Sequence, residues 1–356
     1  MLLEPFFDPL KSYEENWEKG PFGAFADGEV FAPEGAPHFE IFGRKIHTPI
    51  GIPAGPLLNA RFIKAALDKG FDMPMQKTLR TRAKKAHPWP NVLPVCVDGD
   101  LTLEKAAGQL TFNKSFAEPL SVTNSFGNPS YSPDLWQPDL KDAVAWAKEG
   151  QMVVASWEGT DWDNKGEAAL IEDWKLGARL LKETGVGMME MNFSCPNKGT
   201  SNLLCYDVEM SRKIAEAVKP ETSGIPLAIK ISFMSEDYLP EFIKALSGVV
   251  DAFSAINTIA AEVVDENGNQ ALPGQGRLRS GICGSCIKWA GLDMTKRLKE
   301  LRDELGAKYT IISMGGVMTP EDYQEYRSAG ADVVMSATGA MWNPYLAQEI
   351  KQAEVV

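Results

Sequence analysis

Histidine and cysteine, the usual zinc ligands, are scarce in this sequence. Its 356 residues include three histidines and five cysteines. An odd number of cysteines in a long chain does not indicate a disulfide framework. Cys283 and Cys286 form a CxxC motif, but no second motif of this kind and no neighbouring histidine completes a set of four ligands. We therefore expect no metal site.

Long apolar runs and an excess of basic residues are lacking as well. No stretch approaches the ~20 apolar residues that span a bilayer, and the first residues do not show the basic and then apolar pattern of a signal peptide. Lysine and arginine number 36 against 48 aspartates and glutamates, and the net charge of −12 argues against nucleic-acid binding. We expect a cytoplasmic protein with no integral membrane segment and no nucleic-acid partner.

The composition is that of a folded chain with a large core, because 44% of the residues are hydrophobic and 24% are charged. Residues 1–45 are rich in aromatic residues, glycine and proline and show no sustained periodicity. We expect them to form an irregular N-terminal arm. Residues 46–356 are predicted to form a single catalytic domain.

From Thr48 onwards, short apolar runs alternate with stretches of helical periodicity, such as Leu170, Trp174, Ala178 and Leu181. This alternation predicts βα units, and eight of them predict a (βα)8 TIM barrel. An open doubly wound sheet is the alternative, but no GxGxxG motif follows an early strand. The eight predicted strands are Pro49–Ala54, Met73–Thr78, Met152–Trp157, Met188–Phe193, Leu227–Ile231, Phe253–Asn257, Thr310–Met314 and Val333–Ser336.

Two longer intervals, Arg80–Ser121 and Ile259–Ile287, are predicted to be insertions at strand ends. In a TIM barrel, such loops cover the face that carries the active site.

Two lysines, Lys77 and Lys230, each end an otherwise apolar predicted strand. A single lysine at a strand end often only extends its ammonium group into solvent. Two at one barrel mouth indicate a site for an anion or an electron-rich ring. Asparagines at the same end offer the paired donors and acceptors that a flat, amide-bearing ligand such as a pyrimidine ring requires, although each alone could simply cap a loop. These are Asn124, Asn192, Asn197 and Asn257.

Small residues follow the last two predicted strands, at Gly315–Gly316 and Ala337–Thr338. TIM barrels commonly bind a phosphate group at this place, and plain turns are the alternative. Cys195 follows the fourth predicted strand with no histidine near it in the sequence, so a Cys–His hydrolase pair is unsupported. A thiol that acts as a general base and an inert buried thiol both remain open.

The run Asn192-Phe193-Ser194-Cys195-Pro196-Asn197 resembles the active-site loop of the dihydroorotate dehydrogenases, flavoenzymes of pyrimidine synthesis. Further segments match this family in the same order, and the match extends from about Phe42 to the C-terminus. They are Pro53–Gly55, Lys77–Thr78, Asn124–Gly127, Leu227–Lys230, Ile256–Thr258, Ser280–Gly284, Met314–Val317 and Ala337–Thr338. The resemblance implies an FMN cofactor and the oxidation of (S)-dihydroorotate to orotate in UMP synthesis.

The resemblance also implies roles for individual residues. Cys195 falls where class 1 members have the catalytic cysteine base, and Lys77 is the second catalytic residue. The residues expected to bind FMN are Ala54, Gly55, Lys77, Thr78, Asn124, Asn192, Lys230, Ile256, Gly281, Gly315, Gly316, Ala337 and Thr338. Those expected to bind the substrate are Lys77, Asn124, Phe126, Gly127, Asn128, Asn192, Asn197, Asn257 and Thr258.

The subclass is left open by departures from the family pattern. Class 2 members have serine in place of Cys195, but the aromatic N-terminal arm resembles neither the start of class 1 nor that of class 2. Ala337 also replaces the usual glycine. The electron acceptor therefore stays open between fumarate, NAD through an electron-transfer partner subunit, and quinone. A homodimer is expected from the resemblance alone.

Other functions compete with this interpretation. Dihydropyrimidine dehydrogenases share the N-x-S-C-P core but typically continue with histidine, where this chain has Asn197. Dihydrouridine synthases would be expected to add a basic RNA-binding region, against which the net charge argues. A non-redox, phosphate-binding lyase or isomerase and a catalytically silent flavin or nucleotide binder are the remaining alternatives.

Overall fold

Eight parallel strands close into a barrel in a computed structural model that describes residues 2–194 and 203–354. Their order around the barrel is β10-β11-β14-β15-β3-β4-β8-β9. Each strand falls on one of the eight predicted apolar runs, so the TIM-barrel prediction is confirmed. The strands are β3 (Ile50–Ile52), β4 (Met73–Leu79), β8 (Val154–Trp157), β9 (Met188–Asn192), β10 (Leu227–Ile231), β11 (Ala252–Ala255), β14 (Thr310–Met314) and β15 (Val333–Met335).

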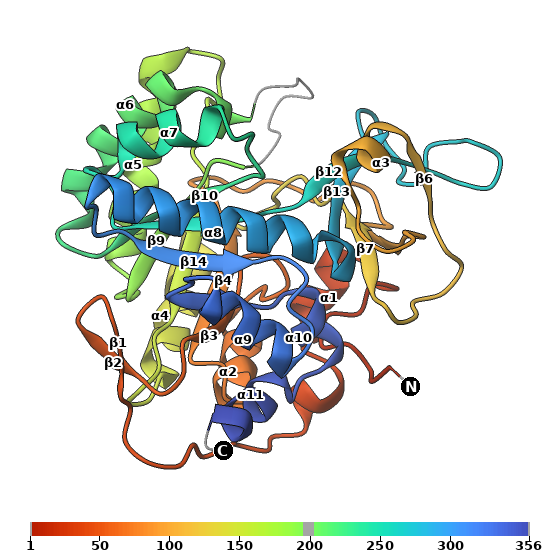
Figure 1. Cartoon of the computed structure of the whole chain (residues 1–356), viewed down its shortest axis with the longest axis horizontal. Coiled ribbons are helices and arrows are strands. Elements are labelled where there is room, and N and C mark those ends of the chain that lie inside the picture. Colours follow the sequence, from red (N-terminus) through yellow and green to blue (C-terminus); the bar gives the residue numbers. More distant parts are fainter. Residues whose placement is uncertain (1, 195–202, 355–356) are drawn as a thin grey trace.

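Helices surround the barrel, as Figure 1 shows. In α2, the side chain of Asn59 accepts hydrogen bonds from the first backbone N–H groups, and Phe62, Ile63 and Ala66 form the buried stripe that faces the barrel. The longer helices are α2 (Ala60–Asp68), α4 (Pro133–Trp146), α5 (Glu167–Lys182), α6 (Val208–Val218), α7 (Tyr238–Leu246), α8 (Lys288–Leu305), α9 (Pro320–Ser328) and α11 (Leu346–Glu354). The short α10 (Thr338–Trp342) follows β15.

A β-hairpin closes one end of the barrel. Strands β1 (Phe39–Ile41) and β2 (Arg44–Ile46) are joined by Phe42 and Gly43, both with positive φ, as a tight two-residue turn requires. Ile41 and Ile46 pack against the side chains that fill the barrel interior, among them Met73 and Met152. The hairpin therefore spans the predicted boundary between the arm and the barrel.

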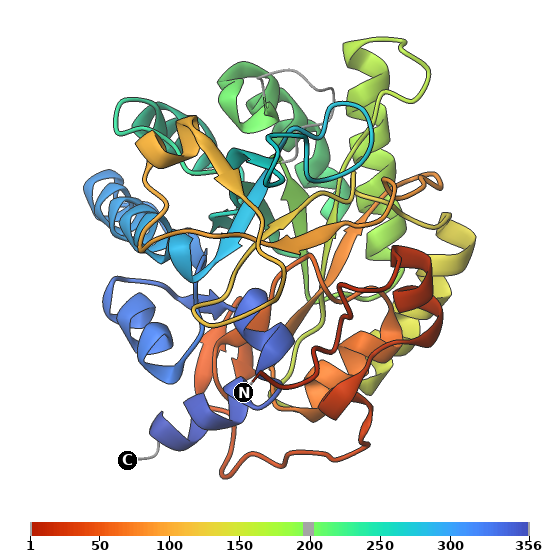
Figure 2. The ribbon, with the colours of Figure 1, turned by 90° about the vertical axis from the view of Figure 1, so that its right-hand side faces the viewer.

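The two insertions pair with each other at the opposite end of the barrel (Figures 1 and 2). They form a five-stranded sheet in which β7, from the first insertion, runs antiparallel to β13, from the second. The sequence analysis placed the insertions correctly but did not predict this sheet. Its strands are β5 (Val92–Pro94), β7 (Ser121–Asn124), β13 (Arg279–Gly284), β12 (Ile259–Val264) and β6 (Gln109–Thr111), and α3 (Leu103–Ala107) lies before β6 in the chain.

The N-terminal arm contains one α-helix, α1 (Tyr13–Lys19), which periodicity did not predict because it has only two turns. Ser12 and Glu15 form a capping box at its start. The arm runs beside α2 in Figure 2, where the Asn59 side-chain amide donates a 2.9 Å hydrogen bond to the Trp17 carbonyl. Among the described residues, no helix has the length and apolar character needed to cross a bilayer.

Close contact between β3 and β4 yields a prediction about barrel closure. Gly51 pairs with Met73, and a Cβ atom at Gly51 would lie 2.2 Å from the Met73 carbonyl oxygen. Gly51→Ala should therefore lower the free energy of unfolding by about 1–3 kcal/mol, the range for overpacking a core. Gly248→Ala is the matched control, because a Cβ atom there meets nothing within 4 Å. Chemical denaturation of both variants tests this, and equal stabilities would contradict it.

Candidate active site

A cavity of about 880 Å³, including its open mouth, lies at the carboxyl ends of the barrel strands. Thirteen of the residues predicted from the sequence line it, and they come from six barrel strand ends and from the first insertion. These are Ala54, Gly55, Lys77, Asn124, Phe126, Lys230, Ile256, Asn257, Thr258, Gly315, Gly316, Ala337 and Thr338. Cys195 and Asn197, the predicted base and one predicted substrate ligand, lie outside the described residues.

Three other predicted residues, Thr78, Asn192 and Gly281, are not part of this lining but lie next to residues of the site. The side-chain amide of Asn192 donates to Thr78 Oγ1 at 3.2 Å, and its carbonyl oxygen accepts from the backbone N–H and hydroxyl of Ser194. Asn192 thereby fixes the first turn of the chain after β9. Gly281 pairs with Asn124, and a Cβ atom at Gly281 would meet Thr258 at 2.6 Å. A side chain at Gly281 would therefore push Thr258 into the cavity.

Asn128 is tied to a buried ion pair. Its side-chain amide donates to Glu158 Oε2 at 2.6 Å, and its backbone carbonyl accepts from Arg80 Nε at 2.8 Å. Arg80 and Glu158 form a salt bridge of 2.8 Å whose side chains are both 1% exposed. Burial raises the pKa of Glu158, while the Arg80 guanidinium opposes this rise. The pair anchors the end of the loop that begins at Asn124.

The middle of the same loop rests on a histidine and an arginine that the sequence analysis did not single out. Gly127 has a φ of +75°, and a Cβ atom there would lie 2.4 Å from His87 Nε2. The other ring nitrogen of His87 lies 3.3 Å from the Ser125 hydroxyl. Burial and the nearby Arg277 lower the pKa of His87, which favours its neutral form.

Arg277 joins three segments around this loop. Its guanidinium is buried and donates to the carbonyl oxygens of Pro88 at 2.8 Å, Ser125 at 2.7 Å and Pro90 at 3.1 Å, and also to that of Pro273. Burial lowers its pKa to about 10, so it still carries a charge at neutral pH. One arginine, followed by β13, therefore ties both insertions to the loop at Asn124. No motif in the sequence marks it.

The two predicted lysines both reach the cavity and are almost fully buried, with 5% and 3% exposure for Lys77 and Lys230. The Lys77 ammonium donates to the Gly55 carbonyl at 3.3 Å and lies 4.5 Å from the centre of the Phe126 ring. A cation over an aromatic face is stabilised by the ring quadrupole. Lys77 and Phe126 thus form one wall of the cavity together.

Glu190 lies in the barrel interior and shares it with Lys230. It is fully buried on β9, between Ser156 on β8 and Ala228 on β10. The hydroxyls of Ser156 and Ser254 interact with the carboxylate and favour its charged form, but among the described residues neither carboxylate oxygen has a hydrogen bond of good geometry. Burial raises the pKa of Glu190, and the Lys230 charge opposes this rise. A glutamate inside the apolar run Met188–Phe193 was the sequence signal that could have identified it.

The thiol of Cys283 also borders the cavity. It accepts a hydrogen bond from the Asn124 amide at 3.5 Å and lies 3.6 Å from the Thr338 hydroxyl. Cys283 and Cys286 are both free, and burial raises the pKa of each thiol, to about 11 for Cys286. Neither is therefore a ready thiolate nucleophile.

The donor set of the cavity fits an anionic molecule that carries a flat ring. Gly315–Gly316 and Ala337–Gly339, which follow β14 and β15, present backbone and small side chains, the surroundings that suit a phosphate group. Lys77, Asn257 and Thr258 offer an ammonium group, an amide and a hydroxyl. Lys230, Cys283 and Asn124 lie in the same lining. FMN combines a phosphate with such a ring, so the residues present fit this cofactor.

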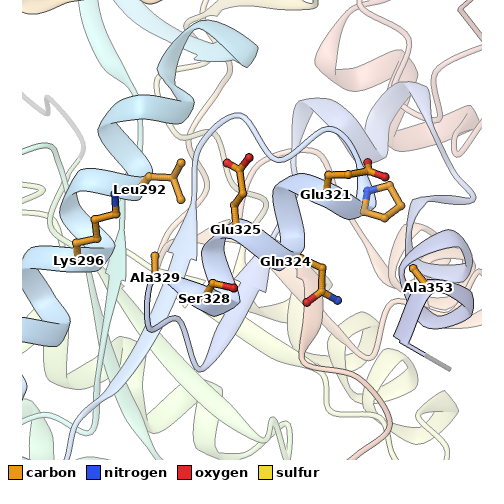
Figure 3. Close-up of a pocket in the computed structure, with 9 residues that line it drawn as sticks. Leu292, Lys296, Glu321, Gln324, Glu325, Ser328, Ala329 and Ala353 are labelled. Atoms are coloured by element: carbon orange, nitrogen blue, oxygen red, sulfur yellow. The ribbon is translucent and has the colours of Figure 1, made fainter. Parts of the chain in front are cut away.

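A second depression lies on the outside of the barrel, between α8, α9 and α11 (Figure 3). Its side chains are mainly those of a solvated surface, such as Lys296, Glu321, Gln324 and Glu325. It contains none of the residues predicted from the sequence. The chemistry of the chain is therefore concentrated in the cavity at the barrel mouth.

Comparison with known proteins identifies the family. The family model for dihydroorotate dehydrogenase matches residues 38–354. The chain belongs to the dihydroorotate dehydrogenase family. Enzymes of this family are FMN-dependent oxidoreductases, so the predicted family, enzyme class and cofactor are confirmed.

Individual members of the dihydroorotate dehydrogenase family agree over most of the chain. A dihydroorotate dehydrogenase of Dictyostelium discoideum is 33% identical over 361 residues, which cover 98% of this chain and 97% of the relative. The catalytic subunit of dihydroorotate dehydrogenase B (NAD(+)) of Desulforamulus reducens is 28% identical, over 74% of this chain and 80% of the relative. The ligand-free structure of the Eimeria tenella enzyme superposes with a TM-score of 0.68 at 19% identity, covering 92% and 88% of the two chains, and shows the same fold.

The buried carboxylate of Glu190 predicts how the stability of this family member depends on pH. Burial raises the pKa of Glu190 in the folded chain above the unfolded value, so folding takes up a proton between the two values. The free energy of unfolding therefore falls as pH rises through that interval. Glutamine is nearly isosteric and cannot ionise. Glu190→Gln should thus gain stability relative to the wild type as pH rises from about 4 to 8.

Thermal unfolding of the wild type and the variant at several pH values tests this expectation. Glu158→Gln is the comparison, because it removes the carboxylate that pairs with the buried Arg80 and should be less stable than the wild type at neutral pH. A stability difference between Glu190→Gln and the wild type that stays constant with pH would show that Glu190 does not titrate as argued.

Proposed function

We propose that this protein oxidises (S)-dihydroorotate to orotate, as a class 1-type enzyme with Cys195 as the base. One observation carries the proposal: two buried lysines and two asparagines, Lys77, Lys230, Asn124 and Asn257, line a single cavity together with the glycines that follow β14. Dihydroorotate brings a carboxylate and ring amides, which these groups complement. The family membership supports the same substrate.

The cofactor and the substrate would share the cavity. Gly315, Gly316, Ala337 and Thr338 would hold the FMN phosphate, and Lys230 would contact the ring. The other proposed contacts to FMN are those of Ala54, Gly55, Lys77, Thr78, Asn124, Asn192, Ile256 and Gly281. When bound, FMN supplies the hydride acceptor of the reaction.

The substrate would be held by the Lys77 ammonium at its carboxylate and by Asn124, Asn257 and Thr258 at its ring amides. Asn197 is proposed as a further ligand on the resemblance alone. Phe126 would form the adjoining wall. Asn192, Gly127 and Asn128 would contribute indirectly. Asn192 and Asn128 hydrogen-bond to Ser194 and Glu158, and Gly127 leaves room for His87, which a side chain at this position would displace.

Cys195 is proposed to remove the proton from C5 of dihydroorotate as the hydride leaves C6. It stands three positions after the end of β9, the strand whose last residue is Asn192. A thiol has an ordinary pKa of about 8.5, so only a small fraction is thiolate at neutral pH. Activity should therefore rise with pH over the neutral range unless the site lowers this pKa.

The first prediction from this proposal concerns the base. Purified protein should be yellow, and dihydroorotate added without oxygen should bleach the flavin absorbance. Cys195→Ala should keep its FMN and bind orotate, but the bleaching should slow by about 100-fold or more, the scale expected for the loss of a positioned base. Stopped-flow absorbance measures both rates. A colourless wild type that takes up no FMN, or a variant that reacts at the normal rate, would contradict the proposal.

A second prediction separates the two lysines of the cavity. Lys230→Ala should weaken FMN retention, whereas Lys77→Ala should act mainly on the substrate and raise the KM for dihydroorotate by about tenfold or more, because an ammonium–carboxylate contact is lost. Lys69→Ala is the matched control, since Lys69 is equally buried but pairs with Asp27 away from the cavity. Flavin content after gel filtration and steady-state kinetics give the two readouts. Normal values in both cavity variants would contradict the assignment.

A further inference from the structure

The N-terminal arm reaches the active-site cavity through a single side chain, Phe7. This residue is 3% exposed and belongs to the cavity lining, although it lies 70 positions before Lys77 in the sequence. The family model matches residues 38–354, and none of the family motifs found in the sequence lies in the arm before residue 38. The role of Phe7 in the cavity must therefore be inferred from its contacts.

Phe7 packs against the residue that faces Lys77. Its ring meets the Phe126 ring edge to face, with centroids 5.7 Å apart and an interplanar angle of 84°. Tyr13, also in the arm, approaches Phe126 from another side at 6.4 Å. The face of Phe126 lies 4.5 Å from the Lys77 ammonium. Phe7, Phe126 and Lys77 thus form a continuous stack that ends at the proposed carboxylate site.

The arm holds Phe7 firmly enough to support that stack. The backbone N–H of Phe6 donates to the carbonyl of Met341 at 3.2 Å, and Met341 itself lines the cavity. After Phe7 in the chain, the backbone N–H of Asp8 donates a hydrogen bond to the side-chain oxygen of Asn16, which is fully buried. Phe7 is therefore fixed on both sides, between α10 and the start of α1.

The position of Lys77 depends on the Phe126 ring. An aromatic ring attracts an ammonium group only over its face, so a ring that tilts weakens the contact and releases the ammonium. The edge-to-face contact with Phe7 restricts such tilting.

We propose that Phe7 is a positioning residue of the active site, which holds Phe126 and through it the Lys77 ammonium in place for the substrate carboxylate. The inference rests on the proposed function, because it assigns Phe7 to the binding of the same substrate. It makes the arm a part of the substrate site.

The test compares neighbouring phenylalanines of the arm. Phe7→Leu should raise the KM for dihydroorotate and the Kd for orotate by about tenfold, with kcat changed by less than about twofold and FMN content unchanged. Phe6→Leu is the matched control: Phe6 is 1% exposed and packs against Phe25 and Phe62, outside the cavity lining. It should lose stability but keep both constants. Phe7→Tyr, which preserves the ring, should restore values close to those of the wild type.

A double-mutant cycle checks the path of the effect. If Phe7 acts through Phe126, then Phe7→Leu and Phe126→Leu should be non-additive, so that the double variant binds orotate about as weakly as Phe126→Leu alone. Steady-state kinetics and calorimetric titration with orotate give the two constants. An active wild type whose Phe7→Leu and Phe6→Leu variants have the same KM, or additive effects in the cycle, would overturn the inference. A wild type that neither binds orotate nor oxidises dihydroorotate would instead refute the proposed function.

Discussion

Two ammonium groups, those of Lys77 and Lys230, are buried at the mouth of a closed barrel, and the rest of the site is arranged around them. Removing an ammonium group from water costs several kcal/mol unless fixed dipoles or charges replace the solvent. For Lys77, the Gly55 carbonyl and the Phe126 ring contribute to this replacement. For Lys230, the carboxylate of Glu190 lies in the same barrel interior. An anionic cofactor and an anionic substrate would neutralise the remaining positive charge. Binding of these anions would therefore also offset the cost of burying the two ammonium groups.

The barrel alone cannot enclose such a site. Its strands have only three to seven residues, so the walls of the cavity beyond the strand ends come from other segments. The paired insertions supply one wall, where Gly281 and Asn124 face each other across β13 and β7. Arg277 locks this wall to the loop at Asn124 through backbone carbonyls. The arm supplies the adjoining wall through Phe7. Three segments that are far apart in the sequence, the arm and the two insertions, thereby meet around one loop.

The barrel strands and half of the cavity lining could be predicted from the sequence, because strand ends follow from local patterns and the family resemblance adds the roles of the residues there. Apolar runs identify buried strands, and in parallel strands the residues that follow them meet at one edge. The sheet made by the insertions could not be predicted in this way. Strands β5 and β6 have three residues each, too few for a period-2 pattern. The partner of Gln109 in β6 is Glu262 in β12, which lies 153 positions further along the chain.

The residues missed by sequence reasoning share a physical cause, which is that their roles arise from tertiary contacts. Phe7 is one aromatic residue among several in the arm, and only the path of the chain brings it to Phe126. Arg277 lies in a loop where an arginine is expected to be exposed, yet it is 2% exposed because backbone carbonyls surround it. Asn128 and Asn124 were both predicted to bind the substrate, but Asn128 has a positive φ and its side chain hydrogen-bonds to Glu158. In each case the neighbours, and not the residue type, decide the role.

The chain is acidic overall, but its cavity carries two ammonium groups. Composition therefore argues against a nucleic-acid partner and does not report on a small anionic ligand. The chain carries a net charge of −12, but surface charges are screened beyond a Debye length of about 8 Å at physiological ionic strength. A polyanion such as RNA must contact a broad surface and would meet that net charge. A small anion inside the cavity meets mainly the buried ammonium groups, whose fields are much less screened. Recognition of the small anion therefore depends on where two strands end, and the overall charge of the chain has little influence on it.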